Sequence, residues 1–108
     1  MGDVFNVTVV NDAPMPHSID FHASQVAPNM EMATILPGKS LVYQFKADYA
    51  GIWMYHCGTA PALEHIANGM FGAVVVDPPN LAPVAHEYVM IQSELYLGPP
   101  GGTGDYAR

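Results

Sequence analysis

Residues 51–57 read Gly-Ile-Trp-Met-Tyr-His-Cys, and this stretch decides the fold. Its aromatic residues, Trp53 and Tyr55, alternate with the residues between them, a period of two that is typical of a half-buried β-strand. Successive side chains of a strand point to opposite faces, so Cys57 shares the apolar face with these aromatic rings. His56 points the other way. The strand therefore carries one side chain able to bind a metal on each face.

The same period of two recurs along the rest of the chain. It predicts further strands at residues 5–10, 18–22, 30–36, 41–46, 70–77 and 86–94. Turn residues separate these runs, at 11–14, 37–38, 48–51 and 77–80. Several short strands at this spacing predict an all-β fold, a Greek-key β-sandwich of two antiparallel sheets. The one expected helical turn covers residues 62–68 and is stopped by Gly69.

Composition and charge exclude several classes of partner. The chain has 108 residues and a net charge of −7, and its only basic residues are Lys39, Lys46 and Arg108. Nucleic acids and anionic lipids require a basic patch, so we expect neither kind of partner. Apolar runs such as residues 73–76 are far too short to cross a membrane, and no secretory signal peptide is recognisable.

The chain length suits one domain with one hydrophobic core. We expect that domain to cover residues 1–97. Residues 98–108 read GPPGGTGDYAR and lack any apolar period, so we expect a Gly/Pro-rich linker or tail there.

The strongest chemical signal is a set of soft metal ligands. Cys57, His65 and Met70 are spaced as Cys-x7-His-x4-Met, and His17 lies well upstream. A thiolate, two imidazoles and a weak axial thioether are the ligands of the copper site that transfers single electrons. We therefore predict that these four residues bind a type 1 copper ion.

Other chemistry would use some of the same residues. Zinc would accept the cysteine and the histidines, but it has little use for a thioether. A Cys–His pair could act as a nucleophile, although no protease or transferase motif accompanies it. Taken singly, Met70 and Cys57 could be core residues, and His65 could cap the helical turn.

Strand parity also predicts a second cluster on the opposite face. His17 and His22 are separated by an odd number of positions, so their side chains point opposite ways. His22 then joins Asp20 and His56 on the polar faces of two strands. These could be ordinary solvated side chains, but they lie on the strands that carry the copper ligands. We predict part of a second copper site, whose two histidines are too few to hold the metal tightly.

These motifs resemble the first domain of copper-containing nitrite reductases. The resemblance covers roughly residues 4–94, and it rests on the segments at 15–22, 35–38, 45–47 and 55–57, followed by His65 and Met70. It implies a cupredoxin fold within a homotrimer of two-domain subunits. It also implies that the four soft ligands hold the electron-accepting type 1 copper.

The resemblance assigns roles to the second cluster as well. It implies that His22 and His56 are two ligands of a type 2 copper that binds nitrite, and that Asp20 hydrogen-bonds the substrate and helps to deliver protons. In the family, the third histidine comes from the second domain of a neighbouring subunit. A single domain would accept an electron but stay inactive unless self-association completed the site. We expect His86, the one remaining histidine, to be an exposed residue.

The family further implies an electron-donor protein or small reductant, and an extracytoplasmic location. Two alternatives remain open. A laccase-like multicopper oxidase would need His-x-His pairs and a histidine on each side of the cysteine, whereas this chain has Asp20-Phe21-His22 and places Gly58 after Cys57. A stand-alone cupredoxin would carry electrons, or only bind copper, without a catalytic site.

Overall fold

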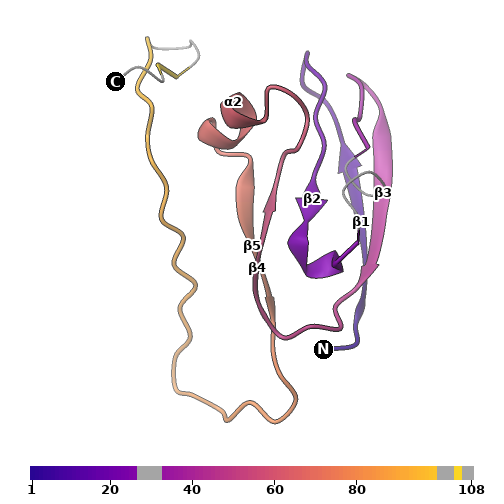
Figure 1. The fold of residues 1–108 in the computed structure, drawn as a ribbon, viewed down its shortest axis with the longest axis vertical. Coiled ribbons are helices and arrows are strands. Elements are labelled where there is room, and N and C mark those ends of the chain that lie inside the picture. Colours follow the sequence, from indigo (N-terminus) through magenta and orange to yellow (C-terminus); the bar gives the residue numbers. More distant parts are fainter. Residues whose placement is uncertain (27–32, 100–103, 106–108) are drawn as a thin grey trace.

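The computed structural model describes residues 1–26, 33–99 and 104–105, in which two sheets face each other (Figure 1). Strands β1 (Val4–Val10) and β3 (Ser40–Lys46) form the first sheet. They run antiparallel, and Val7 pairs with Tyr43. The alternation in both strands turns one apolar row inward, which is why these residues form a half-buried sheet.

The second sheet carries most of the predicted metal ligands at or near its strands. It contains β2 (Asp20–Phe21), β4 (Gly51–His56) and β5 (Phe71–Val76), with β4 in the middle. Both pairings are antiparallel, and Asp20 lies opposite His56. The predicted all-β architecture of two antiparallel sheets is therefore confirmed.

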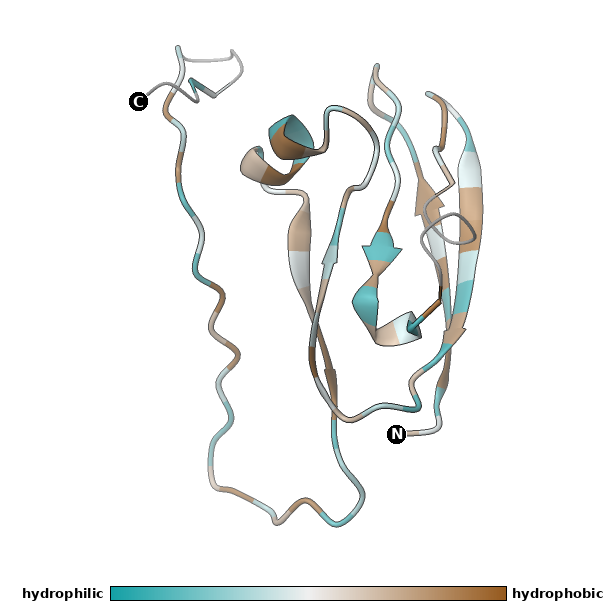
Figure 2. Cartoon of the chain, in the orientation of Figure 1, coloured by the Kyte–Doolittle hydropathy of each residue, from teal (hydrophilic) through white to brown (hydrophobic). Residues whose placement is uncertain are grey.

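Aromatic rings fill the space between the sheets. Phe21 of β2 stacks on Phe45 of β3 with ring centroids 5.1 Å apart, and Tyr55 of β4 lies 5.6 Å from Phe21. Along β3 the burial alternates, with Leu41, Tyr43 and Phe45 more buried than the residues between them. Figure 2 shows apolar bands interrupted by polar ones along this strand. The buried apolar residues come from both sheets and the loops between them: Phe21, Ala23, Ile35, Tyr43, Phe45, Ala47 and Val76.

The second strand is shorter than predicted. In place of a strand over 18–22, β2 ends at Phe21, and His22 begins a 3₁₀ turn, η1 (His22–Ser24). The backbone N–H of Gln25 closes this turn on the carbonyl of His22 at 3.3 Å. A carbonyl engaged in a turn is unavailable to a neighbouring strand, which accounts for the early end.

Part of the strand predicted at 30–36 cannot be compared, because residues 30–32 lie outside the described residues. Residues 33–36 form no strand. Ile35 instead makes an isolated antiparallel bridge with His17, with N–H···O distances of 2.7 and 3.1 Å.

The predicted helical turn is confirmed as α2 (Ala62–Ala67), between β4 and β5. It is capped by Asn68, and Gly69 follows with φ +100°, a conformation that favours glycine. None of the described helices is long and apolar enough to cross a membrane.

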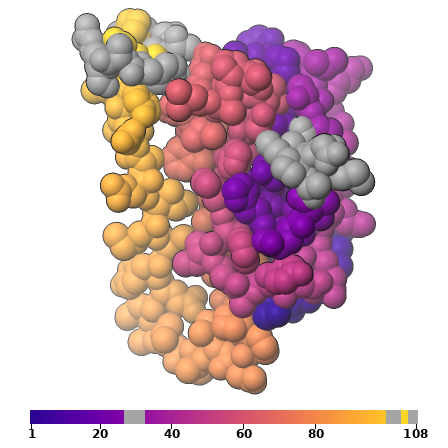
Figure 3. Space-filling model, in the orientation of Figure 1, coloured from indigo at the N-terminus to yellow at the C-terminus, as the bar shows by residue number. Residues whose placement is uncertain are grey.

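The strand predicted at 86–94 is wrong. These residues are extended but belong to no sheet, and Tyr88 and Met90 are 82% and 92% exposed. After β5 the chain reverses and runs back beside the second sheet, where it stands as a separate ridge (Figures 1 and 3). Alternation alone does not make a strand, because a strand also needs a neighbouring backbone to bond. The boundary at residue 97 stays a prediction.

Candidate metal centres

The first cluster forms at the end of the sandwich where α2 lies, from three separate segments. His17 comes from the loop between β1 and β2, Cys57 follows β4 directly, and His65 lies within α2. Cys57 is fully buried and His65 is 4% exposed. The fold therefore brings together residues that are far apart in the sequence, with Cys57 and His65 shielded from solvent and His17 partly exposed.

The donor atoms of these three residues converge. Nδ1 of His65 lies 3.2 Å from Sγ of Cys57, and Nδ1 of His17 lies 4.0 Å from that sulfur. The two Nδ1 atoms are 2.9 Å apart, and all three donor atoms lie within 4.8 Å of one another. One thiol and two imidazoles at this spacing fit a single copper ion. Burial and the neighbouring His65 lower the pKa of His17, which favours the neutral form that binds metals.

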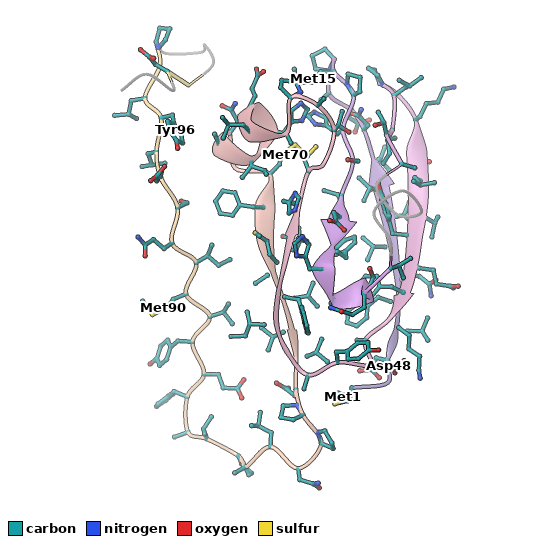
Figure 4. The ribbon with its side chains drawn as sticks, viewed as in Figure 1. Met1, Met15, Asp48, Met70, Met90 and Tyr96 are labelled. Atoms are coloured by element: carbon teal, nitrogen blue, oxygen red, sulfur yellow. The ribbon has the colours of Figure 1, made fainter. Side chains whose placement is uncertain are left out.

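Met70 lies beside this cluster, immediately before β5 (Figure 4). Its carbonyl accepts the N–H of Cys57 at 3.0 Å, and its own N–H donates to the carbonyl of His65 at 3.1 Å. These backbone bonds tie Met70 to two other predicted ligands. The position suits a weak axial thioether, although its role as a ligand stays a prediction.

The second cluster lies on the other side of β4. Nε2 of His22 is 3.0 Å from Nε2 of His56, and Oδ2 of Asp20 lies 3.4 and 3.9 Å from these two nitrogens. The side chains of Asp20 and His56 are 14% and 17% exposed, whereas that of His22 is 40% exposed. The parity argument therefore places both groups correctly, and this cluster opens to solvent on the His22 side.

The backbone sets which nitrogen of His56 faces the second cluster. Nδ1 of His56 lies 3.0 Å from the carbonyl oxygen of Cys57, and a carbonyl can only accept, so Nδ1 carries the proton. In neutral His56 the lone pair is then on Nε2, the atom that faces His22 and Asp20. A histidine bound to metal is commonly oriented by such a bond to its other nitrogen.

Several polar residues that sequence reasoning did not single out hold the ligand-bearing loops. Asn11 is buried, and its amide donates to the carbonyls of Met15 at 2.9 Å and Ile35 at 2.8 Å. It thus ties the loop that carries His17 to the segment that bridges to it. The hydroxyl of Tyr43 accepts the N–H of Ile19 at 3.2 Å. Burial raises the pKa of Tyr43, so the hydroxyl keeps its proton. His86, in contrast, is exposed as predicted.

Comparison with known proteins gives consistent results. The sequence profile of the multicopper oxidase family matches residues 1–80. A copper-containing nitrite reductase from Neisseria meningitidis is 37% identical over 108 residues, covering 95% of this chain and 28% of that protein. The enzyme of the same name from Alcaligenes xylosoxydans xylosoxydans is 36% identical, covering 98% of this chain and 36% of that protein. The chain thus spans about a third of the length of these relatives.

Solved structures resemble the chain in the same way. A copper nitrite reductase from Nitrosomonas europaea superposes with a TM-score of 0.84 at 40% identity, over 90% of this chain and 36% of that one. A blue copper oxidase from the same organism superposes with a TM-score of 0.64 at 35% identity, over 76% of this chain and 28% of that one. The predicted cupredoxin fold, and the resemblance to copper nitrite reductases, are therefore confirmed.

Proposed function

The chain belongs to the multicopper oxidase family, and from that premise we propose that it is the electron-transfer domain of a copper nitrite reductase. In this proposal the first cluster holds a type 1 copper, and the second cluster supplies half of a type 2 site that reduces nitrite. One observation carries the proposal: the adjacent residues His56 and Cys57 belong to different clusters on opposite sides of β4. A single peptide link then connects the electron-accepting site to the catalytic one.

The first cluster is built to exchange electrons and to exclude substrate. A bound copper there would store one electron, because a thiolate, two imidazoles and a thioether support both of its oxidation states. Cys57 and His65 are buried, and Met70 is well placed to fill the remaining position. With four protein ligands in place, such a copper would offer nitrite no open position.

The second cluster has the features that a nitrite site needs. Copper at this site would bind nitrite and pass it one electron, and conversion to nitric oxide and water also consumes two protons. His22 and His56 would hold the metal through Nε2. Oδ2 of Asp20 lies within 4 Å of both nitrogens, where it could hold a proton beside the substrate.

Two imidazoles do not complete a type 2 site, so a further ligand has to come from another chain or domain. We propose that a neighbouring subunit supplies a third histidine, in a homotrimer with closed symmetry. The other proposed partners are nitrite and an electron-donor protein or small reductant. The proposed location is extracytoplasmic, in keeping with the relatives that the chain resembles.

The colour of the copper-loaded chain tests the first site. We expect intense visible absorption from the bond between the Cys57 thiolate and copper(II), and its complete loss in Cys57→Ser. His86→Ala, which changes an exposed histidine outside both clusters, serves as the control and should keep the colour. A coloured Cys57→Ser variant would overturn the assignment.

Copper content and nitrite turnover test the second site. After dialysis we expect about one tightly held copper per chain, since only the first cluster offers a full ligand set. With a reduced dye as donor, nitrite turnover should be slow or absent, and His22→Ala should leave the visible colour unchanged. Two retained coppers with sustained turnover, both lost in His22→Ala, would show that a neighbouring copy already completes the site.

A laccase-like oxidase is the second candidate, favoured by the likeness to a blue copper oxidase. Reduction of dioxygen at a trinuclear copper cluster needs more imidazoles than the second cluster provides, because Asp20 takes the place of one of them. Oxygen uptake with the same reduced dye distinguishes the two: we expect none, and sustained uptake would favour the oxidase.

A further inference from the structure

Asn68 and Gly69 form an Asn-Gly pair beside the first cluster. The pair follows α2 directly and precedes Met70, so it lies between two of the four predicted copper ligands, His65 and Met70. Both residues of the pair are exposed to solvent. Asparagine is a thermolabile residue, because its side-chain amide is lost spontaneously when the next backbone nitrogen reaches it. A chemically reactive bond therefore lies within the segment that joins two ligands.

The reaction is an attack by the backbone on the side chain. The backbone nitrogen of Gly69 gives up its proton and bonds to Cγ of Asn68, while the bond from Cγ to Nδ2 breaks and Nδ2 takes up a proton and leaves as ammonia. Water then opens the cyclic imide at one of its two carbonyl carbons, which gives either aspartate or isoaspartate. No electrons are transferred, and water is the only co-reactant. Glycine favours the attack because no Cβ shields its nitrogen.

The cap of α2 restrains both reacting groups. The N–H of Gly69 donates to the carbonyl of Ile66 at 2.9 Å. The side-chain amide of Asn68 donates to the carbonyl of Glu64 at 2.7 Å, so the side chain is held back along the helix. The attack requires both hydrogen bonds to break, and the reaction is therefore limited by how often the cap opens.

The cap is held closed by its surroundings more than by the helix itself. α2 has six residues, far fewer than the roughly 12 that an isolated helix needs to be stable in water. His65 and Met70, on either side of the pair, are both fixed when copper is bound, and binding to the closed form alone lowers the open population by mass action. We propose that Asn68-Gly69 is a deamidation site that bound copper protects, an inference that rests on the proposed type 1 site.

Deamidation would in turn damage the copper site. Isoaspartate lengthens the backbone between His65 and Met70 by one carbon. Met70 is tied by backbone hydrogen bonds to Cys57 at 3.0 Å and to His65 at 3.1 Å, and the longer segment displaces it from them. Either product also adds a negative charge at the C-terminal end of α2, where the carbonyl groups already carry partial negative charge. A chain that stays without copper therefore loses its ability to bind copper as it ages.

The rate of deamidation with and without copper tests the inference. Copper-free, copper-loaded and guanidinium-unfolded samples of the full chain are kept in warm, mildly alkaline, oxygen-free buffer, and peptide mass spectrometry measures conversion at Asn68. With copper at about ten times its Kd, we expect conversion about tenfold slower than in the copper-free chain. The unfolded chain should react fastest. Asn80 is exposed but precedes the bulky Leu81, so it serves as the internal control and should stay largely intact in every sample.

Two variants separate protection by the site from other effects of copper. Cys57→Ser removes a ligand, so copper should no longer slow the conversion at Asn68. Asn68→Ser cannot form the cyclic imide. When Asn68→Ser is aged without copper and then reloaded, it should regain its full colour, whereas the original chain should lose colour in proportion to its isoaspartate content.

The outcomes separate this inference from the proposed function. A copper-loaded chain without colour overturns the type 1 assignment, and protection by copper falls with it. A coloured chain whose Asn68 converts equally fast with and without copper, or stays intact even when the chain is unfolded, overturns this inference alone. So does an aged, deamidated chain that regains as much colour as Asn68→Ser.

Discussion

The strand register around His56 and Cys57 decides which cluster each of these ligands joins. His56 and Cys57 are neighbours on an extended chain, so their side chains diverge, and β4 pairs with β2 such that His56 lies opposite Asp20. Slipping this register by one position would exchange the imidazole and the thiol between the buried and the open face. Both clusters therefore depend on how firmly the register is set, and the aromatic rings of Phe21 and Tyr55, which lie opposite each other, set it.

The prediction that Met70 is the axial copper ligand can be tested by exchanging its sulfur for an oxygen ligand. We expect Met70→Gln to fold normally and to lower the reduction potential, because an oxygen ligand is harder than a thioether and favours copper(II). Potentiometric titration of the copper-loaded chain measures the change.

Met54→Gln provides the control for this variant, because Met54 is half exposed on β4 and belongs to neither cluster. It should leave the potential unchanged. If Met70→Gln matches Met54→Gln, then Met70 is a packing residue and no ligand.

Residues with distinctive chemistry could be placed from the sequence, and those without it could not. The chain has one cysteine and five histidines, so few arrangements were possible. Parity assigned His17 and Cys57 to one group and Asp20, His22 and His56 to the other, and the spacing after Cys57 added His65. The structure reproduces both groups. Asn11 gave no such signal, because small polar residues are frequent in turns. Its role comes from hydrogen bonds between segments that only the folded chain brings together.

The packing of β4 against β5 depends on a glycine at position 72, which has no side chain. Gly72 is buried and lies opposite Tyr55, and its backbone conformation would accept other residues. A Cβ at this position would overlap Cζ and Oη of Tyr55 and lie 2.7 Å from its Cε1. Tyr55 would have to leave its place beside Phe21. We expect Gly72→Ala to lower the free energy of unfolding of the copper-free chain by about 1–3 kcal/mol, measured by urea denaturation.

A double-mutant cycle identifies the cause of that loss. In the background of Tyr55→Ala the clash disappears, so Gly72→Ala should then lower the free energy of unfolding only slightly. An equal loss of free energy of unfolding in both backgrounds would mean that the glycine matters for another reason, such as its backbone conformation.

At the scale of whole elements, the strands that pair across a full sheet were predictable. Alternation found β1, β3, β4 and β5 because each buries one face and bonds a neighbour along its length. It overestimated β2, where a turn takes the carbonyl of His22. It failed at 86–94, where the pattern is present but the described chain supplies no partner strand. A pattern of side chains reports burial and carries no information on which backbone lies alongside.

The outer face of the second sheet bears on the assembly of the molecule. Ile52 is 74% exposed and Val75, its partner across the ladder, is 45% exposed. By parity Ile52 and Met54 lie on the same face as His56. A partner that completes the second cluster could also cover these apolar side chains. We expect the chain to self-associate as a trimer at micromolar concentration, and sedimentation velocity measures its mass.

Matched lysine variants locate the interface. Ile52→Lys places a charge beside the second cluster and should shift the population toward monomer. Val42→Lys makes the same kind of change on the exposed face of the other sheet, where Val42 is 58% exposed, and should leave the mass unchanged. A monomer for the original chain at all concentrations, or equal behaviour of the two variants, would contradict this prediction.

The ridge that follows β5 affects how readily the purified protein aggregates and is cut by proteases. Its extended backbone lies outside any sheet, and residues such as Met90 and Leu95 are almost wholly exposed. An apolar, extended segment of this kind can add to the sheet edge of another molecule, which is the first step of aggregation. Proteases also cut extended, accessible backbone most readily. Concentrated stocks should therefore lose material by precipitation and clipping at this segment, while the two sheets and their clusters survive as the resistant fragment.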